Sequence, residues 1–325
     1  MIAPSYLLLD KAEGVTSFWA LGAIKRLAGT KKVGHTGTLD AFASGLLVVL
    51  LGHATKISGA VTDLDKRYEA EFTFGTSTDT LDPTGEITGK GAVPEVTEIE
   101  SRLADFTGTI MQRPPAFSAV HIGGRRASEL ARMGETPRPE PREVRVDRFE
   151  LRGVEGDRFT FDIDCSKGTY VRSLARDLAA ACGSVAHVTR LRRIRVGPLD
   201  VADAVPAARF EARADSGQNG GDLSQPPAGA ANIRPATELI RRLWGDIFVH
   251  LNNKDTAAVQ NGVPARFFVA GPLDEDARIA LVDPAESLVA MVRGSKSGKP
   301  EYLFVVPGAA VRRDKAPDTD GTGGF

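Results

Sequence analysis

Cysteine is scarce in this sequence, and long apolar runs are missing. The 325 residues include two cysteines, Cys165 and Cys182, and neither has histidines around it at metal-ligand spacing. Two thiols do not give the disulfide framework that small secreted domains need. No stretch reaches the ~20 apolar residues of a membrane-spanning helix, and no cationic segment precedes the short apolar run at the N-terminus. We therefore expect a cytoplasmic protein that binds neither a metal nor a membrane and keeps both thiols buried and inert.

An excess of charge of one sign is also missing, since the net charge is −1 at pH 7. A nearly neutral total can still hide a polarised surface. The window 166–195 has one acid, Asp177, against seven bases, which are Lys167, Arg172, Arg176, Arg190, Arg192, Arg193 and Arg195. Such a run is often only the solvated face of a helix and a strand edge; the alternative is a surface for an anionic polymer. Charge alone leaves both interpretations open.

Alternation of apolar and polar residues predicts half-buried strands at 67–74 and 157–165, and an apolar run predicts a first strand at 6–10. The segment 15–29 predicts a helix that Thr16 or Ser17 caps. A second helix is expected to begin near Tyr170, because apolar residues recur there at helical spacing, namely Val171, Leu174, Leu178 and Ala181. Strands outnumber long helices, so we expect an α+β fold with a mixed, largely antiparallel sheet and helices packed on it.

The C-terminal third differs in composition from the rest. Residues 211–232 contain almost no large apolar side chains and are rich in Gly, Ser, Gln and Pro, which predicts a flexible linker. Short apolar runs separated by turn residues follow at 233–311 and predict a small β domain. We therefore expect a catalytic domain at 1–210, the linker, this small domain and a disordered tail at 312–325.

The stretch GHTGTLD, residues 34–40, crowds polar residues and glycines directly before an apolar run. It is not a phosphate-binding loop, because His35 stands where the phosphate-binding lysine is required and a helix, not a strand, is expected before it. Asp40 could simply cap the short segment that follows. A cap does not require the neighbouring glycines, threonines and histidine, so the stretch indicates a functional site.

Four segments, in order along the chain, resemble the TruB family of tRNA pseudouridine synthases. The central one is GHTGTLDAFASGLLVVLLGHATK; the others are LLLDKAEGVTS, KRYEAEFTFGTSTDTLDPTG, and CSKGTYVRSLARDL followed by AHVTRLRRIRVG. The segment RPPAFSAVHIGGRRASELARMG resembles the family's RNA-contacting segment. Together they span roughly residues 5 to 205, and four ordered matches make the resemblance highly specific.

The resemblance implies that Asp40 is the nucleophile and that Arg172 lies against it. An opposite charge at close range would hold the pKa of Asp40 down by ~1 to 3 units. The resemblance also implies that Tyr68 stacks on a base flipped out of the RNA and takes part in the final proton removal. On pattern alone, Tyr68 could equally be an ordinary core residue, because it shares a strand face with Phe72 and Phe74.

The resemblance implies further contacts with the substrate. The residues expected to make them are His35, Tyr170, Leu191, Lys11, Lys56, Asp82 and Lys167. The four arginines from Arg190 to Arg195 are expected to flank the pocket and meet phosphates.

The implied activity is the isomerisation of uridine to pseudouridine at position 55 in the T-loop of tRNA, without a cofactor. The implied partner is the T stem-loop, bound by a monomer that needs no other protein, and the small C-terminal domain is expected to be a PUA-like RNA-binding module. Two alternatives stay open at this point: a tRNA-folding chaperone whose site is incidental, and a synthase that acts on a different RNA.

Overall fold

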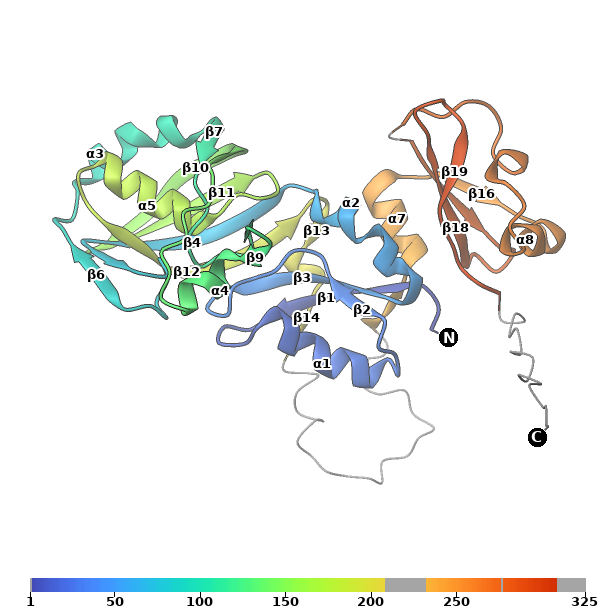
Figure 1. The fold of residues 1–325 in the computed structure, drawn as a ribbon, viewed down its shortest axis with the longest axis horizontal. Coiled ribbons are helices and arrows are strands. Elements are labelled where there is room, and N and C mark those ends of the chain that lie inside the picture. Colours follow the sequence, from blue (N-terminus) through green and yellow to red (C-terminus); the bar gives the residue numbers. More distant parts are fainter. Residues whose placement is uncertain (1, 208–231, 276, 309–325) are drawn as a thin grey trace, which may run out of the picture. The chain divides into compact units, whose positions relative to one another are not determined.

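The computed structural model describes residues 2–207, 232–275 and 277–308. These residues form two compact units, Pro4–Arg234 and the part of the chain from Pro235 onward (Figure 1). Of the expected linker, 211–232, only Asn232 belongs to the described residues, and the expected tail, 312–325, lies outside them.

The first unit is built around one large sheet. Its strands and the short strands near it are β1 (Ser5–Lys11), β2 (Val33–His35), β3 (Ser44–Leu51), β4 (Lys66–Phe74), β5 (Thr76–Thr78), β6 (Ile87–Lys90), β7 (Gly108–Gln112), β8 (His121–Ile122), β9 (Arg125–Arg126), β10 (Arg142–Glu155), β11 (Arg158–Cys165), β12 (Ala186–Val196), β13 (Leu199–Asp200) and β14 (Val205–Pro206). Its helices are α1 (Ser17–Leu27), α2 (Ser58–Thr62), α3 (Val96–Arg102), α4 (Ala127–Arg132) and α5 (Val171–Ala181), with 3-10 turns η1 (Gly52–Ile57), η2 (Leu103–Phe106) and η3 (Val201–Asp203).

The strand order of the large sheet is β14-β1-β3-β12-β4-β11-β10-β7. Along this path β1–β14 and β3–β12 are parallel, and the other pairs are antiparallel. The expected α+β fold with a mixed, largely antiparallel sheet is therefore confirmed. The β3–β12 pairing is short, joining Arg192 to Ser44 and Arg193 to Gly45, and it brings the residues that follow Asp40 next to β12.

Local sequence signals account for most of these elements. The Thr16 side chain accepts a hydrogen bond from the backbone N–H of Trp19, so Thr16 is the cap expected for α1. In β4 the predicted alternation is confirmed, with Tyr68, Ala70, Phe72 and Phe74 all buried. The helix expected to begin near Tyr170 is confirmed as α5, which ends at Ala181.

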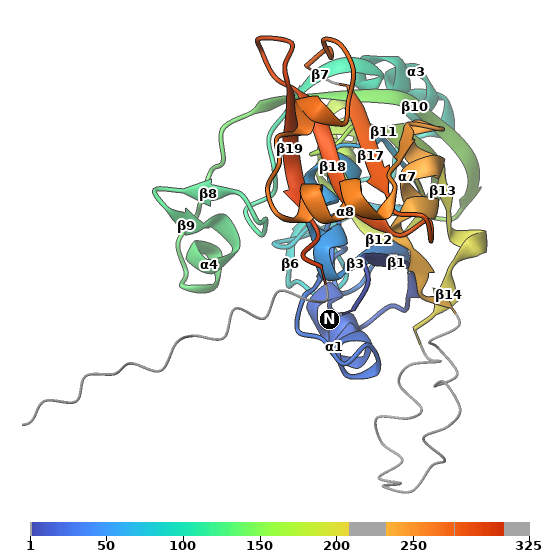
Figure 2. The same cartoon turned by 90° about the vertical axis from the view of Figure 1, so that its right-hand side faces the viewer.

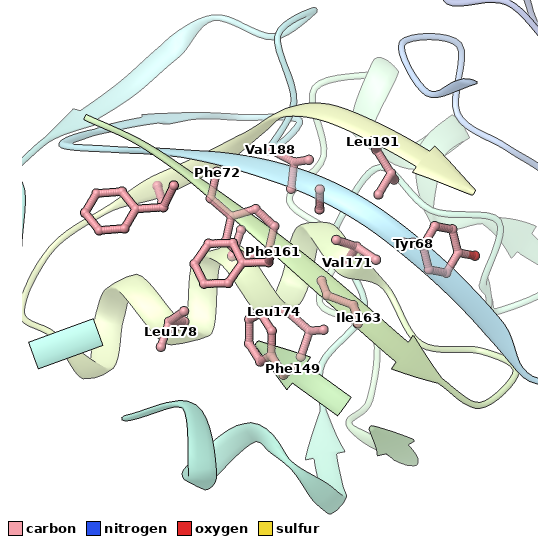
Figure 3. Close-up of a cluster of buried hydrophobic side chains, with 14 of the residues drawn as sticks. Tyr68, Phe72, Phe149, Phe161, Ile163, Val171, Leu174, Leu178, Val188 and Leu191 are labelled. Atoms are coloured by element: carbon pink, nitrogen blue, oxygen red, sulfur yellow. The ribbon is translucent and has the colours of Figure 1, made fainter. Parts of the chain in front are cut away.

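Helix α5 packs on the face of the sheet formed by β4, β11 and β12, and their apolar side chains form one core (Figure 3). Cys165 belongs to this core, and both cysteines are free and buried, as expected. Burial raises the pKa of Cys165 to about 12, so the thiol stays protonated. Tyr68 lies at the end of the cluster near Leu191, and its oxygen points away from the other labelled side chains (Figure 3).

The second unit contains a sheet of its own, ordered β16-β17-β18-β19 (Figure 2). Its elements, with β15 at its start, are β15 (Arg234–Pro235), α7 (Ala236–Trp244), β16 (Phe248–His250), α8 (Asn253–Gln260), η5 (Ala265–Phe267), β17 (Arg278–Val282), β18 (Leu288–Gly294) and β19 (Pro300–Val305). The expected small C-terminal β fold is confirmed. Across the described parts of both units, every helix is too short or too polar to cross a bilayer.

Candidate active site

Asp40 lies in the loop between β2 and β3, and two buried contacts fix this loop. Ser17 at the start of α1 both donates to the Leu39 carbonyl at 3.0 Å and accepts from the Leu39 N–H at 2.9 Å. The Thr36 N–H donates to the Val48 carbonyl at 3.0 Å. Residues 41 and 42 form bends, and no helix begins after Asp40. Asp40 is therefore not a helix cap, and the structure rejects that alternative.

The carboxylate of Asp40 forms an ion pair with Arg172, which α5 supplies. Arg172 Nε lies 2.9 Å from Asp40 Oδ2; the arginine side chain is 5% exposed, whereas that of Asp40 is 38% exposed. The remaining guanidinium donors bond to the Thr80 carbonyl at 2.8 Å and the Phe117 carbonyl at 3.0 Å. These hydrogen bonds hold the guanidinium in one orientation. Arg172 therefore contacts the carboxylate of Asp40 from its buried side.

Burial raises the pKa of Asp40, and Arg172 is the largest influence that opposes this shift. The charge of Asp82 adds to the increase, while that of Lys11 reduces it. Arg172 lowers the pKa of Asp40, as expected, but the net shift is upward, so the expectation of a pKa below the ordinary value is wrong. The effect of desolvation outweighs the attraction of the arginine.

Asp82 lies on the opposite side of Arg172, 3.5 Å from it, and is itself buried. Its Oδ1 accepts hydrogen bonds from the Thr80 hydroxyl at 2.8 Å, the Thr84 hydroxyl at 2.6 Å and the Thr84 N–H at 3.0 Å. Leu81 has a positive φ of 60° in this turn, a conformation unusual for a residue other than glycine. The expected substrate-binding residue Asp82 thus contacts Arg172 and holds a strained turn.

Tyr68 is 9% exposed and lies opposite Arg193 in the β4–β12 ladder. Burial raises the pKa of its hydroxyl, whereas the charge of Arg193 and a hydrogen bond from it act in the opposite direction. Tyr68 belongs to the same buried cluster as Leu39, from the Asp40 loop, and Leu191, from β12. The Asp40 loop, β4 and β12, which were expected to form the pocket, therefore meet at this cluster.

Tyr170 is half-buried and directly precedes α5. The Gln112 side-chain amide holds its backbone at both ends, accepting from the Tyr170 N–H at 2.8 Å and donating to the Tyr170 carbonyl at 3.1 Å. The Arg142 guanidinium lies over the Tyr170 ring, 5.1 Å from its centroid. Gln112 and Arg142 were not predicted, since neither lies in a recognisable motif and both come from strands distant in sequence.

His35 and Lys11 lie beside the Asp40 loop. The His35 Nδ1 is buried without a hydrogen-bond partner, and burial followed by the charge of Arg193 lowers the pKa of the ring. Lys11 is fully buried, and its ammonium donates to the carbonyls of Ala12, Val15 and Ala41. Burial lowers the pKa of Lys11 to about 8. Lys11 thus secures the loop on the side of Ala41, the residue after Asp40.

Lys56 and Lys167 are both exposed. Lys56 lies in η1, and Lys167 forms an ion pair with Asp63 at 2.9 Å. The contacts of the described residues do not bring either lysine to Asp40.

A groove of about 270 Å³ runs beside Leu191. Residues of β4, β11 and β12 line it, together with Glu13, Ser44 and Arg152. Asp40, Tyr68 and Arg172 are not among its lining residues. Glu69, Glu71 and Arg192, which line the groove, alternate along their strands with Tyr68, Ala70 and Leu191. The groove therefore lies on the face of the sheet opposite the buried cluster that contains Tyr68.

Most cations of the basic window 166–195 have partners within the protein. Arg192 pairs with Asp10 at 2.8 Å, and Arg176 pairs with Asp177 at 2.7 Å. Arg193 is buried and bonds to backbone carbonyls, so the expectation that it meets phosphates is wrong. Its side chain lies on the same face of the sheet as that of Tyr68, bonds to the Asp40 loop at Gly37, and is shielded from solvent.

Comparisons with known proteins identify the family. Residues 25–171 match the TruB family pseudouridylate synthase N-terminal domain, and residues 172–226 match the tRNA pseudouridylate synthase B C-terminal domain. The tRNA pseudouridine synthase B of Treponema pallidum (strain Nichols) is 43% identical, over 67% of this chain and 68% of that protein. The protein of the same name from Borreliella burgdorferi (strain ZS7) is 48% identical, over 61% of this chain and 72% of that protein.

Among solved structures, a chain in the crystal structure of a Cbf5-Nop10-Gar1 complex matches with a TM-score of 0.61 and 26% identity, over 89% of this chain and 78% of that chain. The fold, the ordered motifs and these relatives agree with one another. The chain therefore belongs to the TruB family of pseudouridylate synthases, a class of isomerases.

Proposed function

We propose that this protein converts uridine to pseudouridine at position 55 in the T-loop of tRNA, with Asp40 as the nucleophile. The observation that carries the proposal is the Asp40–Arg172 ion pair, in which the arginine is buried and the carboxylate remains partly open. Relatives named tRNA pseudouridine synthase B support tRNA as the substrate. The protein would act as a monomer, without a cofactor.

The reaction moves one glycosidic bond and consumes nothing. The bond between N1 of uracil and C1′ of the ribose breaks, the base turns, and C5 bonds to C1′; N1 gains a proton and C5 loses one. An ionised carboxylate suffices as the nucleophile. Asp40 would attack C1′ or C6, or assist formation of a glycal intermediate, and Arg172 would favour its ionised form.

A target base inside a folded RNA loop must be flipped out, at a cost of a few kcal/mol. Stacking of the base on Tyr68 would offset much of this cost, since stacking on an aromatic ring is worth ~1 to 3 kcal/mol. Tyr68 would also take part in removing the C5 proton. Tyr170 and Leu191 would line the pocket, and His35 would support the rearranged RNA loop.

Exposed cations would contact the phosphates around the pocket and along the tRNA. In the first unit the candidates are Lys56, Lys167 and Arg190. In the second unit they include Lys254 and Arg266, both exposed. The second unit would be an RNA-binding module that takes no part in the isomerisation.

The proposal is tested with a T stem-loop RNA and a full-length tRNA as substrates of the purified protein. Pseudouridine is expected at the target uridine in both RNAs. Mapping of pseudouridines in total RNA from cells that lack the protein should show loss of the same site. Modification of a different RNA in place of tRNA would overturn the substrate assignment, and tRNA binding without any product would favour the chaperone alternative.

A further inference from the structure

Arg193 is a buried cation that the mechanism above does not use. Its residue surface is 1% exposed, and it forms no ion pair with a carboxylate among the described residues. Three basic groups, Lys11, Lys66 and His35, are near enough for its charge to lower their pKa values, in addition to the larger effect of burial. Burying an arginine without a counterion is costly, so its donors must be well satisfied by other groups.

The guanidinium of Arg193 joins both ends of the loop that carries Asp40. Its Nε donates to the Leu46 carbonyl at 2.8 Å, and its Nη2 donates to the Gly37 carbonyl at 3.1 Å. Gly37 precedes Asp40 by three residues, and Leu46 follows it in β3. A side chain at Gly45 would overlap the Arg193 backbone, so glycine is what allows β12 to approach β3 here.

The same guanidinium also faces Tyr68. Arg193 and Tyr68 are directly opposite each other in an antiparallel pair, as are their neighbours Leu191 and Ala70. Directly opposed residues place their side chains on the same face of a sheet. The positive charge of Arg193 lowers the pKa of the Tyr68 hydroxyl, against the effect of burial and of the nearby Cys165 and Asp40.

We propose that Arg193 is a positioning residue for the isomerisation: it fixes the Tyr68 hydroxyl and the Asp40 loop in one arrangement. The inference rests on the proposed function, because the arrangement matters only if Asp40 and Tyr68 act on the RNA. Arg193 would act through Tyr68 and through the loop that carries Asp40, to whose carbonyls it donates. Its fixed positive charge lowers the pKa of the Tyr68 hydroxyl, so the phenolate that can accept a proton forms more readily than burial alone would allow.

The test uses the full chain with Arg193→Met, which keeps the apolar stem, and Arg193→Lys, which keeps the charge but not the planar fork. The matched control is Arg67→Lys, because Arg67 adjoins Tyr68 on β4 but pairs with Asp164. The readouts are the single-turnover rate at saturating tRNA, tRNA affinity, and the ionisation of Tyr68. Ionisation is followed by NMR of ¹³Cζ-labelled tyrosine, and Tyr68→Phe identifies the resonance among the four tyrosines.

In Arg193→Met we expect the Tyr68 pKa to rise and the single-turnover rate to fall at least about tenfold, the equivalent of one pKa unit. Affinity for tRNA should be unchanged, Arg193→Lys should restore part of the rate, and the control should match wild type. A folded Arg193→Met with an unaltered Tyr68 titration would overturn the proposal. If Arg193→Met does not fold, a wild-type rate in Arg193→Lys would overturn it.

The Tyr68 titration separates this inference from the proposed function, since it requires no turnover. If wild type forms no pseudouridine, the proposed function fails, and the role of Arg193 in the reaction fails with it. If wild type is active but Arg193→Met changes neither the titration nor the rate, only the inference fails.

Discussion

Arg172 donates from Nε to Oδ2 of Asp40 at 2.9 Å from a side chain that is 5% exposed, while the Asp40 side chain is 38% exposed. The two partners of this ion pair therefore differ in access: an incoming group can reach the carboxylate but not the guanidinium. Because the carbonyls of Thr80 and Phe117 engage the other guanidinium nitrogens, Arg172 cannot easily turn toward a phosphate. The positive charge of Arg172 therefore stays beside Asp40.

Removal of this charge should change the pH dependence of catalysis. Burial raises the pKa of Asp40 and Arg172 is the main opposing influence, so Arg172→Met should raise that pKa further. If the ionised carboxylate is required, activity rises as pH rises through the pKa, and the acid limb of the single-turnover profile should move to higher pH. The control Arg176→Met, one turn along α5, should leave the limb in place. An unmoved limb in folded Arg172→Met would contradict the assigned role.

Asp82→Asn should lower both stability and the Asp40 pKa. Asp82 is buried beside Arg172, and loss of one partner of a buried charged pair costs on the order of 3 kcal/mol of unfolding free energy. Its negative charge also raises the pKa of Asp40, so the acid limb should move to lower pH, opposite to Arg172→Met. Urea denaturation and the pH profile measure the two effects. Asp79→Asn, at an exposed position of the same turn, is the control; equal effects in both variants would refute the pairing argument.

Tyr68→Phe should retain tRNA affinity but lose most of the turnover. Phenylalanine keeps the stacking surface, whereas the hydroxyl, whose pKa the charge of Arg193 lowers, is gone. Affinity by filter binding and single-turnover rates separate the two contributions. Tyr6→Phe, at a buried position in β1, controls for the loss of a buried hydroxyl. A fully active Tyr68→Phe would leave Tyr68 only a stacking role.

The second unit should contribute affinity but not rate. In the full chain, the double variant Lys254→Ala/Arg266→Ala removes two exposed cations, and each lost phosphate contact should reduce the slope of log affinity against log salt by ~0.7 to 0.9. The single-turnover rate at saturating tRNA should not change. Arg278→Ala, whose guanidinium bonds to backbone carbonyls of its own unit, is the control. An unchanged slope would show that neither cation meets RNA.

Sequence reasoning predicted the features that local physics determines. The Thr16 cap of α1 and the alternation of β4 depend on residues a few positions apart, and both are confirmed. The motif around Asp40 was recognisable because glycines and polar residues stand together before an apolar run.

Long-range register was not predictable in the same way. Arg193 was expected to meet phosphates, but β12 contains two irregularities in its pairing with β4, and the second follows Arg193 directly. A shift of one residue moves every side chain to the other face, so an alternating basic run does not reveal which arginine points inward. The position of Asp82 beside Arg172 likewise depends on a turn that the sequence places 90 residues away.

The most direct test of the account is the amount of pseudouridine that Asp40→Asn forms in tRNA. Asparagine keeps the size of the side chain and removes the nucleophilic charge, while binding rests on phosphates and stacking. We predict that Asp40→Asn binds tRNA within a few fold of wild type and forms no detectable pseudouridine, even at enzyme excess and long incubation. Measurable turnover by the pure variant would contradict the assignment of Asp40 as the nucleophile.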